Sequence, residues 1–522
     1  MLIEINRKDQ LEQLTLSQVW DMVIIGGGAT GLGTAVDAAS RGFKVLLVEK
    51  YDFAKGTSSK STKLVHGGVR YLANGDIKLV IGALRERGLI FKNAPHVSSA
   101  QSFVIPLYST FDKLKYLVGL KLYDWLAGSL RIGKSVLLSK KEVVEKLPHI
   151  KQNGLKGGIL YYDGQFDDAR LAVNLGQTAV EHGATVLNYM EASNFHKNAD
   201  GKIDSVTVRD TETGETYTIQ AKTVINATGI FVDDILKLDS PNHKNLVRPS
   251  QGSHIVIDQK FLDGHDALMI PETSDGRVLF GVPWHGKVLL GTTDIPINEH
   301  EIEPRPMEDE INFILTTADN YLNPAPKRED ILSIYAGLRP LAAPKDNEES
   351  TKEISRDHKL IHSASGLITI TGGKWTTYRK MAEETVNMAI SVGKLKDVPC
   401  RTKHLAIHGS TPDVYHEHWN LYGKDYQAIQ QLIQENESLR EHLVAGYEYN
   451  AAEVVWACRY EMIRKVEDFL ARRCRLLLLD AKAAKQAAPK VAALMAQELG
   501  KSSEWAQNEV NQFNELADRY LL

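Results

Sequence analysis

Residues 21–33 read DMVIIGGGATGLG, and the chain continues to KVLLVEK at 44–50. The run MVII is short and apolar, as buried parallel strands are. Gly26, Gly28 and Gly31 follow it with the spacing G-x-G-x-x-G. In this spacing the first glycine allows a tight turn, the second lets backbone approach a pyrophosphate, and the third lets helix and strand pack closely. The stretch therefore predicts a strand, a glycine turn and a helix that bind a dinucleotide.

The acid after the second apolar run supports this prediction. Glu49 ends KVLLV, and a carboxylate about 20 residues after the glycines accepts hydrogen bonds from a ribose diol. The helix through TAVDAASRG would turn its positive N-terminal end toward the phosphates. An ordinary strand–helix turn is the alternative, but it gives Glu49 no role. We expect the cofactor to contact Gly26, Gly27, Gly28, Ala29, Thr30, Gly31 and Glu49.

Two later segments repeat the order of strand, glycine turn and helix. They are AKTVINATGIFVDDIL at 221–236 and GLITITGGKWTTYRKMAEETVNMAI at 366–390. A nicotinamide dehydrogenase would normally keep its first dinucleotide fold contiguous, whereas these units lie far apart. The spacing favours a flavin-binding fold that is interrupted by segments of a substrate domain. We expect backbone to approach the flavin at Ala227, Thr228, Gly229, Gly372 and Gly373.

Composition narrows the class of protein. The 522 residues suffice for two or three domains, and 43% hydrophobic and 25% charged residues are ordinary for a globular protein. A net charge of −4 argues against a nucleic-acid binder. Cys400, Cys458 and Cys474 are scattered and lack metal-ligand spacing, which favours a reducing compartment and no metal site. The start MLIEINRKDQ lacks the apolar core of a signal peptide, and no apolar run is long enough to span a bilayer, so any membrane contact should be peripheral.

The pattern of apolar and polar residues changes between the glycine turns and again near residue 400. GSHIVID, RVLFGVPW and KVLLGTTD, within 252–294, are short apolar runs separated by Gly and Asp, as in a sheet. Beyond residue 400, DYQAIQQLIQENESLREHLVAG and the long run from NAAEVVW have helical periodicity. A helical C-terminal domain is therefore expected.

Several motifs together resemble one family. IIGGGATGLGTAVDAASRG, GTSSKSTKLVHGGVRYL, FDDARL, VINATGIFV, GSHIVI, GTTD, YAGLRPL and TGGKWTTYRKMAE occur in order between residues 18 and about 500. In these motifs the chain resembles the FAD-dependent, quinone-reducing glycerol-3-phosphate dehydrogenases. The resemblance implies an α/β fold: a Rossmann-like FAD domain of the glutathione-reductase/D-amino-acid-oxidase type, an inserted antiparallel-sheet cap domain and a helical C-terminal domain. We expect the FAD domain at 18–90, 151–240 and 335–395, the cap at 91–150 and 241–334, and the helical domain at 400–522.

The resemblance also assigns residues to the cofactor and the substrate. In TSSKSTKLVHGGVRY (57–71), the residues expected along a noncovalently bound FAD are Thr57, Ser58, Ser61, Lys63, Leu64 and His66. Cations beside an apolar ring are costly unless an anion neutralises them, and arginine binds a phosphate through paired hydrogen bonds. The family's matching positions hold the substrate phosphate and polarise the reacting hydroxyl. These positions are Arg70, Tyr71, Arg339 and Lys374.

The implied reaction oxidises sn-glycerol 3-phosphate to dihydroxyacetone phosphate by hydride transfer from C2 to FAD, with quinone as the final acceptor. A base must take the proton of the C2 hydroxyl. His254 is the candidate, with His66 behind it, although His254 could equally be a satisfied histidine at a sheet edge. We expect Arg339 and Lys374 to assist as catalytic residues.

Membrane contact is expected at FDKLKYLVGLKLYDWLAGSLRIGK (111–134). Basic side chains in this segment outnumber acidic ones, and basic amphipathic segments bind anionic membrane surfaces. The residues expected near one helical face are Leu114, Leu117, Val118, Tyr123, Trp125 and Leu126, and the basic residues are Lys113, Lys115, Lys121, Arg131 and Lys134. A surface helix packed on the core is the alternative. Family behaviour favours peripheral association with the inner face of the cytoplasmic membrane, and a homodimer is possible.

Three alternatives remain. A glycerol-3-phosphate oxidase that uses oxygen and produces hydrogen peroxide would share every motif, but that branch tends to carry an insertion before the last glycine turn, and Arg339 and Lys374 lie close together here. An amine or 2-hydroxyacid oxidoreductase of the same fold is disfavoured by HGGVRY and GGKWTTYR. A non-enzymatic flavoprotein would not need the set of cations.

Overall fold

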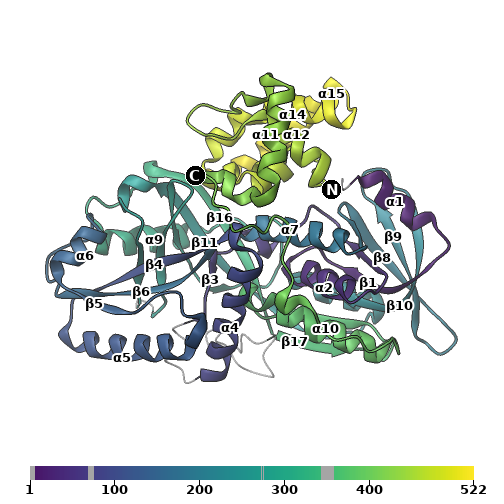
Figure 1. Cartoon of the computed structure of the whole chain (residues 1–522), viewed down its shortest axis with the longest axis horizontal. Coiled ribbons are helices and arrows are strands. Elements are labelled where there is room, and N and C mark those ends of the chain that lie inside the picture. Colours follow the sequence, from purple (N-terminus) through teal and green to yellow (C-terminus); the bar gives the residue numbers. More distant parts are fainter. Residues whose placement is uncertain (1–5, 69–75, 272, 274–275, 343–357) are drawn as a thin grey trace.

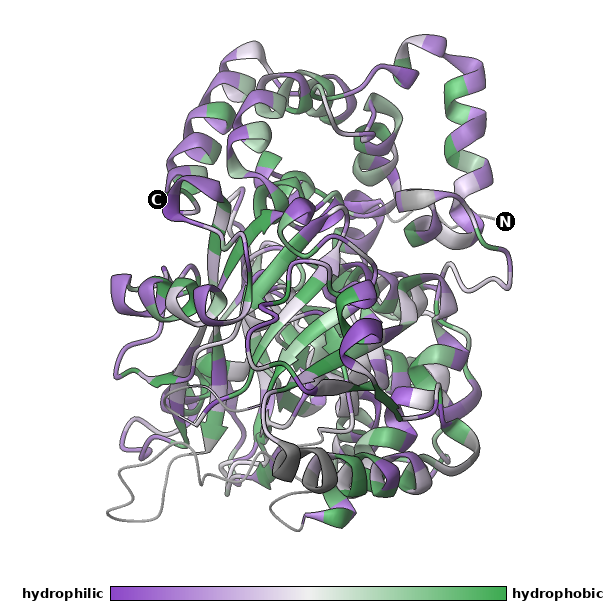
Figure 2. Ribbon diagram, turned by 90° about the vertical axis from the view of Figure 1, so that its left-hand side faces the viewer, coloured by the Kyte–Doolittle hydropathy of each residue, from purple (hydrophilic) through white to green (hydrophobic). Residues whose placement is uncertain are grey.

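The computed structural model describes residues 6–68, 76–271, 273, 276–342 and 358–522. Figure 1 shows two sheets side by side, with the helices of the C-terminal region above the junction between them. Figure 2 shows apolar strands through the middle of the molecule, while the helices at the top carry polar residues on their outer turns. The α/β fold with a second sheet and a helical C-terminal region is therefore confirmed.

The first sheet has a parallel centre. Its strand order is β17-β18-β10-β1-β2-β7, and β9 pairs with β10 and β8 with β9. The pairs β1–β2, β1–β10, β10–β18 and β2–β7 are parallel. The strands are β1 (Val19–Ile25), β2 (Val45–Val48), β7 (Thr185–Leu187), β8 (Met190–Lys197), β9 (Ile203–Asp210), β10 (Thr216–Asn226), β17 (His358–His362) and β18 (Ile368–Gly372).

Helices follow the parallel strands at their carboxyl ends, as the repeated strand–glycine–helix pattern predicts. The helix α2 (Ala29–Ser40) follows β1, α8 (Val232–Asp239) follows β10, and α10 (Tyr378–Val392) follows β18. Both α10 and α7 (Asp168–Glu181) pack against α2. The three glycine turns therefore lie together at the carboxyl ends of the parallel strands. Ligands in such folds bind beyond these ends.

The second sheet is mostly antiparallel. Its order is β15-β11-β14-β13-β12-β4-β6-β3, and β16 pairs with β11 and β5 with β6. The strands are β3 (Leu64–Val65), β4 (Ser98–Leu107), β5 (Val136–Leu138), β6 (Gly157–Phe166), β11 (Val247–Asp258), β12 (Ala267–Ile270), β13 (Leu279–Trp284), β14 (Lys287–Gly291), β15 (Ile295–Pro296) and β16 (Ile331–Ala342). The helices α4 (Ile77–Asn93), α5 (Thr110–Ala127), α6 (Lys140–Lys146) and α9 (Glu308–Tyr321) lie on this half of the molecule.

The C-terminal region is helical and is tied to both sheets. Its α-helices are α11 (Tyr426–Glu435), α12 (Ala451–Tyr460), α13 (Leu476–Leu479), α14 (Ala481–Leu499) and α15 (Ser503–Asp518). The chain end returns to the second sheet, where the Ile334 amide donates to the carbonyl of Tyr520 at 2.9 Å. Arg473, on the π-helical turn before α13, donates to Asp52 near the first sheet. The region is thus joined to the rest of the chain through buried contacts.

Strand pairing departs from the expected division into domains at β3, β6 and β16. β3 falls within the expected FAD segment 18–90, yet it pairs with β6 in the second sheet. β6 falls within the expected FAD segment 151–240, and β16 falls mostly within 335–395, yet both hydrogen-bond in the second sheet. The reason is long-range pairing: β6 runs along β4, and β16 runs along nearly all of β11. Local spacing does not reveal such partners. The domain boundaries themselves stay a prediction.

Helix α5 forms over most of the segment that we expected to bind a membrane, but its apolar residues do not share one face. Tyr123 is 2% exposed, whereas Val118 and Trp125 are 60% and 75% exposed. Residues three to four positions apart share a helical face, so Val118 and Trp125 point outward while Tyr123 points to the core. The side chains of 110–115, which include Lys113, Leu114 and Lys115, lie outside the described part. Among the described residues, no helix combines the length and apolarity needed to cross a bilayer.

Candidate active site

The first glycine turn allows backbone contacts that other residues would block. Gly26 has φ +112°, and a Cβ on it would lie 2.6 Å from the carbonyl oxygen of Ala227. A Cβ on Gly31 would lie 1.9 Å from the Gly26 carbonyl oxygen. The start of α2 can therefore approach both the turn after β1 and the turn after β10. This close approach directs the N-terminal end of α2 toward a cavity.

Glu49 lies at the rim of the same turn. Its carboxylate accepts hydrogen bonds from the amides of Gly27 at 2.6 Å and Tyr51 at 2.8 Å. Burial raises the pKa of the Glu49 carboxyl, while these two amides act in the opposite direction. The carboxylate is thus fixed in place and lines the cavity, where it can accept hydrogen bonds from a diol, as the sequence predicts.

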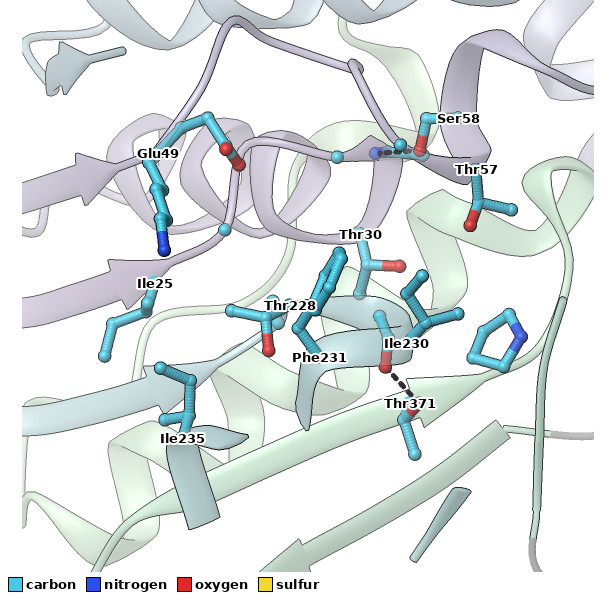
Figure 3. Close-up of a pocket in the computed structure, with 18 of the residues that line it drawn as sticks. Ile25, Thr30, Glu49, Thr57, Ser58, Thr228, Ile230, Phe231, Ile235 and Thr371 are labelled. Carbon is cyan, nitrogen blue, oxygen red and sulfur yellow. Dashed lines mark hydrogen bonds between the residues drawn. The ribbon is translucent and has the colours of Figure 1, made fainter. Parts of the chain in front are cut away.

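The cavity measures about 590 Å³ and draws its lining from all three glycine turns. Figure 3 shows Glu49 on one side and Thr57 and Ser58 on another, with Thr228 and Phe231 between them. Ser58 Oγ accepts from the amide of Ala29 at 3.0 Å, and Trp375 Nε1 donates to the Ser58 carbonyl at 2.8 Å. The predicted cofactor residues that line it are Gly26, Gly28, Ala29, Thr30, Glu49, Thr57, Ser58, Ala227, Thr228, Gly229, Gly372, Gly373 and Lys374.

These residues fit an FAD molecule. A dinucleotide needs a helix N-terminus for its phosphates, a carboxylate for its ribose and a surface for its ring. The amino end of α2, Glu49 and the Gly372–Gly373 turn supply these three features along one cavity. Its volume also lies in the range of cofactor sites.

A second cavity, of about 310 Å³, adjoins the first. The two share Thr57, Pro340 and the turn Gly372–Trp375 as lining residues. The predicted residues that line the second cavity are Thr57, Ser61, Leu64, His66, His254, Arg339, Gly372, Gly373 and Lys374. A ring bound at the shared turn would therefore face a small chamber lined by Arg339 and Lys374, two of the predicted substrate residues.

Arg339 is held firmly in this chamber. Its Nη1 donates to Asp294 Oδ1 at 3.2 Å, and its Nη2 donates to Thr292 Oγ1 and to the Thr293 carbonyl, each at 3.1 Å. Asp294 thus balances part of the guanidinium charge. Lys60, which also lines this cavity, is similarly paired with Glu303. Fixed carboxylates thus compensate two of the cations that line the cavity, Arg339 and Lys60.

His254 occupies the middle of β11 and is 2% exposed. Its Nε2 lies 2.9 Å from Thr62 Oγ1, and its ring stacks on Tyr335 with centroids 4.7 Å apart. Among the described residues, Nδ1 has no hydrogen-bond partner. Burial holds the pKa of His254 well below its usual value, and Lys63 and Arg339 lower it further. This shift favours the neutral imidazole and at the same time makes it a weak base.

Lys63 is placed differently from the prediction. Its side chain is fully buried and its ammonium group donates to Asp168 Oδ2 at 2.7 Å instead of lining either cavity. Ser61 Oγ donates to the same carboxylate at 2.7 Å. Burial lowers the pKa of Lys63 to about 8. Lys63 thus fixes the turn that carries Ser61 and Thr62, because its charge needs a partner in the core.

Two other predicted residues, Gly27 and Gly31, also stand apart from the cavity walls. Gly27 and Gly31 shape the turn from behind, through the Glu49 contact and the crossing of α2. Arg70 and Tyr71 lie outside the described residues.

The structure adds residues that sequence reasoning missed. Arg277, Asp163 and Tyr161 line the second cavity, and Arg209 lines the first. Arg277 is the first residue of the run RVLFGVPW, which predicts a strand and does not mark a site. Asp163 and Tyr161 lie in β6, whose pairing brings them beside β3 and His66. No local motif marks these positions.

Comparison with known families agrees with this geometry. A family model described as FAD dependent oxidoreductase matches residues 21–379, and one described as C-terminal domain of alpha-glycerophosphate oxidase matches 365–506. A probable mitochondrial glycerol-3-phosphate dehydrogenase of Dictyostelium discoideum is 41% identical over 94% of this chain and 82% of its own length. The mitochondrial glycerol-3-phosphate dehydrogenase of Saccharomyces cerevisiae is 39% identical over 97% and 90%, respectively.

Solved structures give the same result. The glycerol-3-phosphate dehydrogenase from Bacillus halodurans, complexed with FAD, superposes with a TM-score of 0.80 at 30% identity, covering 98% of this chain and 97% of that one. The L-alpha-glycerophosphate oxidase from Mycoplasma pneumoniae, with FAD bound, has a TM-score of 0.59 at 18% identity, covering 74% and 97%, and shares the fold. By its sequence, its fold and its cofactor cavity, this chain belongs to the FAD-dependent glycerol-3-phosphate dehydrogenase family.

Proposed function

We propose that this protein oxidises sn-glycerol 3-phosphate to dihydroxyacetone phosphate, with FAD as its noncovalent cofactor and a membrane quinone as the electron acceptor. The observation that carries the proposal is the second cavity, because it places Arg277, Arg339 and Lys374 beside the turn shared with the cofactor cavity. When bound, FAD takes up the hydride and supplies the redox chemistry.

The charges of the cavity suit a phosphate monoester. Such a group carries nearly two negative charges and binds arginine through paired hydrogen bonds. Arg339 is already held by Asp294, Thr292 and Thr293, so little side-chain entropy remains to be lost when a phosphate binds. Lys374 follows the Gly372–Gly373 turn and lies between the two cavities. From there its ammonium group can also polarise the reacting hydroxyl.

His254 is our candidate for the base. A general base must be unprotonated at the working pH and within reach of the substrate. Burial keeps its imidazole neutral, and the residue lines the substrate cavity. The Thr62 contact and the stacked Tyr335 ring orient the imidazole, and the cationic Arg339 stabilises negative charge on the substrate oxygen as the proton leaves.

Turnover with different acceptors tests the proposal. Glycerol 3-phosphate should bleach the visible flavin absorbance of the purified holoenzyme under anaerobic conditions. Steady-state turnover should be faster with a soluble quinone analogue than with oxygen, and little hydrogen peroxide should form. A holoenzyme that glycerol 3-phosphate cannot reduce would refute the substrate assignment. Faster turnover with oxygen would instead favour the oxidase alternative.

The quinone acceptor implies a membrane-facing surface, which we place on α4, α5 and β5. Helix α4 packs against α5, and β5 follows shortly after α5 in the chain. The exposed large apolar residues of this surface are Ile77, Ile81, Val118, Leu122, Trp125, Val136 and Leu137. Exposed basic residues on the same elements and the adjoining turn are Lys78, Lys121, Arg131 and Lys134. Apolar side chains among basic ones suit the interface of an anionic membrane.

Binding to vesicles tests this surface. The double variant Val118→Ser/Trp125→Ser should bind vesicles containing phosphatidylglycerol at least about tenfold more weakly, because it removes the two most exposed apolar side chains of this surface. Lys121→Glu should have a smaller effect, of about 1 kcal/mol, that salt abolishes. Val414→Ser is the matched control, since Val414 is exposed but lies far along the chain, in the C-terminal region. Equal binding by the double variant and the control would exclude α5. A homodimer stays a prediction that sedimentation would test.

A further inference from the structure

We propose that Tyr123, on the inner side of α5, is a positioning residue for the anionic substrate. With Asp163 and Arg87 it fixes the backbone of Gly67 at the wall of the second cavity. The inference rests on the proposed function, since it concerns the affinity of the same cavity. It also gives a role to a residue that the sequence assigned to the membrane face.

The hydrogen bonds around Tyr123 have a fixed direction. Its hydroxyl lies 2.6 Å from Asp163 Oδ2 and 2.8 Å from the Gly67 amide nitrogen. An ionised carboxylate only accepts and an amide N–H only donates. The tyrosine must therefore donate its proton to Asp163 and accept from Gly67. Burial and the Asp163 charge raise the pKa of Tyr123 well above its usual value, so the hydroxyl keeps its proton.

Arg87 balances the charge on Asp163. Its Nη1 donates to Asp163 Oδ1 at 2.9 Å and its Nη2 to the Leu130 carbonyl at 3.3 Å. Asp163 lines the substrate cavity, where an uncompensated carboxylate would repel a phosphate. Arg87 is 1% exposed, so the pair is poorly screened by solvent. The carboxylate can therefore orient Tyr123 without opposing the substrate.

The backbone around Gly67 is confined on both sides. A Cβ on Gly67 would lie 2.6 Å from the Tyr123 hydroxyl and 2.7 Å from Leu84 Cδ2, so the chain passes directly over the tyrosine. On the other side, the amide of His66 donates to Thr376 Oγ1 at 3.2 Å. Thr376 follows Lys374 by two residues. The segment is thus held between α5 and the turn that separates the two cavities.

Two residues of this segment reach the cavity. His66 and Gly68 both line it, and Gly67 joins them. A shift of Gly67 therefore moves both lining residues toward or away from the substrate. Displacements of about 1 Å are enough to change the binding of an oriented ligand strongly. Tyr123 acts through this backbone and does not itself line the cavity.

The isosteric variant Tyr123→Phe tests the inference. It removes both hydrogen bonds and leaves the Gly67 amide without its partner. We expect KM for glycerol 3-phosphate to rise about tenfold, with kcat within about twofold, because the reacting groups are unchanged. The affinity of the holoenzyme for inorganic phosphate, followed through the visible flavin spectrum, should fall by a similar factor. FAD content and Tm should stay near those of the wild type.

Two further variants complete the test. Tyr108→Phe is the matched control, since it removes a 2.8 Å hydrogen bond to the Lys151 carbonyl outside both cavities. Its KM should equal that of the wild type. Gly67→Ala keeps Tyr123 but puts a Cβ 2.6 Å from its hydroxyl, which must displace the same backbone, so this variant should also raise KM and weaken phosphate binding.

The possible failures are distinguishable. If the wild type does not oxidise glycerol 3-phosphate, the proposed function is wrong, and the phosphate titration alone then tests the positioning role. If the wild type turns over normally and Tyr123→Phe and Gly67→Ala both keep its KM and phosphate affinity, the positioning role is wrong. If Tyr123→Phe lowers only Tm, Tyr123 serves stability alone and the inference is overturned.

Discussion

The two cavities differ in what lines them: mainly backbone in the cofactor cavity and mainly side chains in the substrate cavity. The cofactor cavity is formed largely by backbone at three glycine turns, each directly after a strand of the first sheet. The substrate cavity is lined by side chains such as His254 on β11, Arg339 on β16 and Arg277 just before β13. A backbone site depends on conformation, and a side-chain site depends on charge. Substitutions in the two places should therefore fail in different ways.

Gly31→Ala should have the largest effect, on the cofactor side. Its Cβ would lie 1.9 Å from the Gly26 carbonyl oxygen, and backbone cannot yield cheaply there. We expect the variant to be purified without FAD, or not to fold, as judged from visible absorbance. Gly82→Ala is the control, because a Cβ on Gly82 meets nothing within 4 Å. A yellow Gly31→Ala protein would contradict the view that this crossing is essential.

Arg339→Ala and Lys374→Ala should impair the chemistry and leave the fold intact. Loss of one charge-assisted contact costs roughly 1.5–3 kcal/mol, which lowers kcat/KM about tenfold to a hundredfold. FAD content should persist in Arg339→Ala, because Arg339 does not line the cofactor cavity. Arg328→Ala removes an exposed ion pair with Glu308 and should be neutral. Wild-type kinetics in both variants would end the substrate assignment.

His408, a half-buried histidine away from both cavities, provides a reference for the effect of carboxylate partners. Asp425 and Glu181 raise its pKa from 6.5 to about 9 although burial acts the other way. The folded state therefore favours the charged imidazolium. The stabilisation that this gives is fully present below pH 6.5 and is lost as the pH rises through 9. The free energy of unfolding should fall by up to about 3 kcal/mol over this range. The free energy of unfolding of His408→Gln, measured by chemical denaturation, should not show this fall with pH. If the variant kept the pH dependence of the wild type, His408 would not be its source.

The smallest expected effect concerns His254 in the substrate cavity. Burial, then Lys63 and Arg339, hold its pKa well below 6.5. If His254 is the base, its protonation should not lower kcat/KM between pH 8 and 6.5, because the imidazole stays neutral over this range. Removing one neighbouring cation, as in Arg339→Gln, should move the acidic limb of the profile upward by a fraction of a pH unit. An acidic limb that stays at the same pH in Arg339→Gln would exclude His254 as the titrating group.

Much of the fold and of the cofactor cavity could be predicted from the sequence. The three strand–glycine–helix units form as β1–α2, β10–α8 and β18–α10, and the helical C-terminal region follows residue 400. These features are encoded locally, because hydrophobic period, glycine turns and helix starts need only neighbouring residues. Thirteen of the predicted cofactor residues, from Gly26 to Lys374, line one cavity for the same reason.

The substrate cavity was predicted only in part, because its contacts join distant segments. Arg339, His254 and Lys374 were found through the family resemblance, whereas Arg277 and Asp163 have no local signal. Helical periodicity placed Tyr123 on the membrane face, and the family resemblance placed Lys63 along the cofactor.

The sequence by itself thus determined the cofactor turns, the order of strands and helices, and the family. Only the tertiary structure decided that β6 pairs with β4 and β16 with β11, that Lys63 turns to Asp168, and that Tyr123 turns to Gly67. The physical reason is that a turn's conformation is set by its own residues. The partner of a buried charge or hydroxyl is set instead by whichever distant segment the packed core brings beside it.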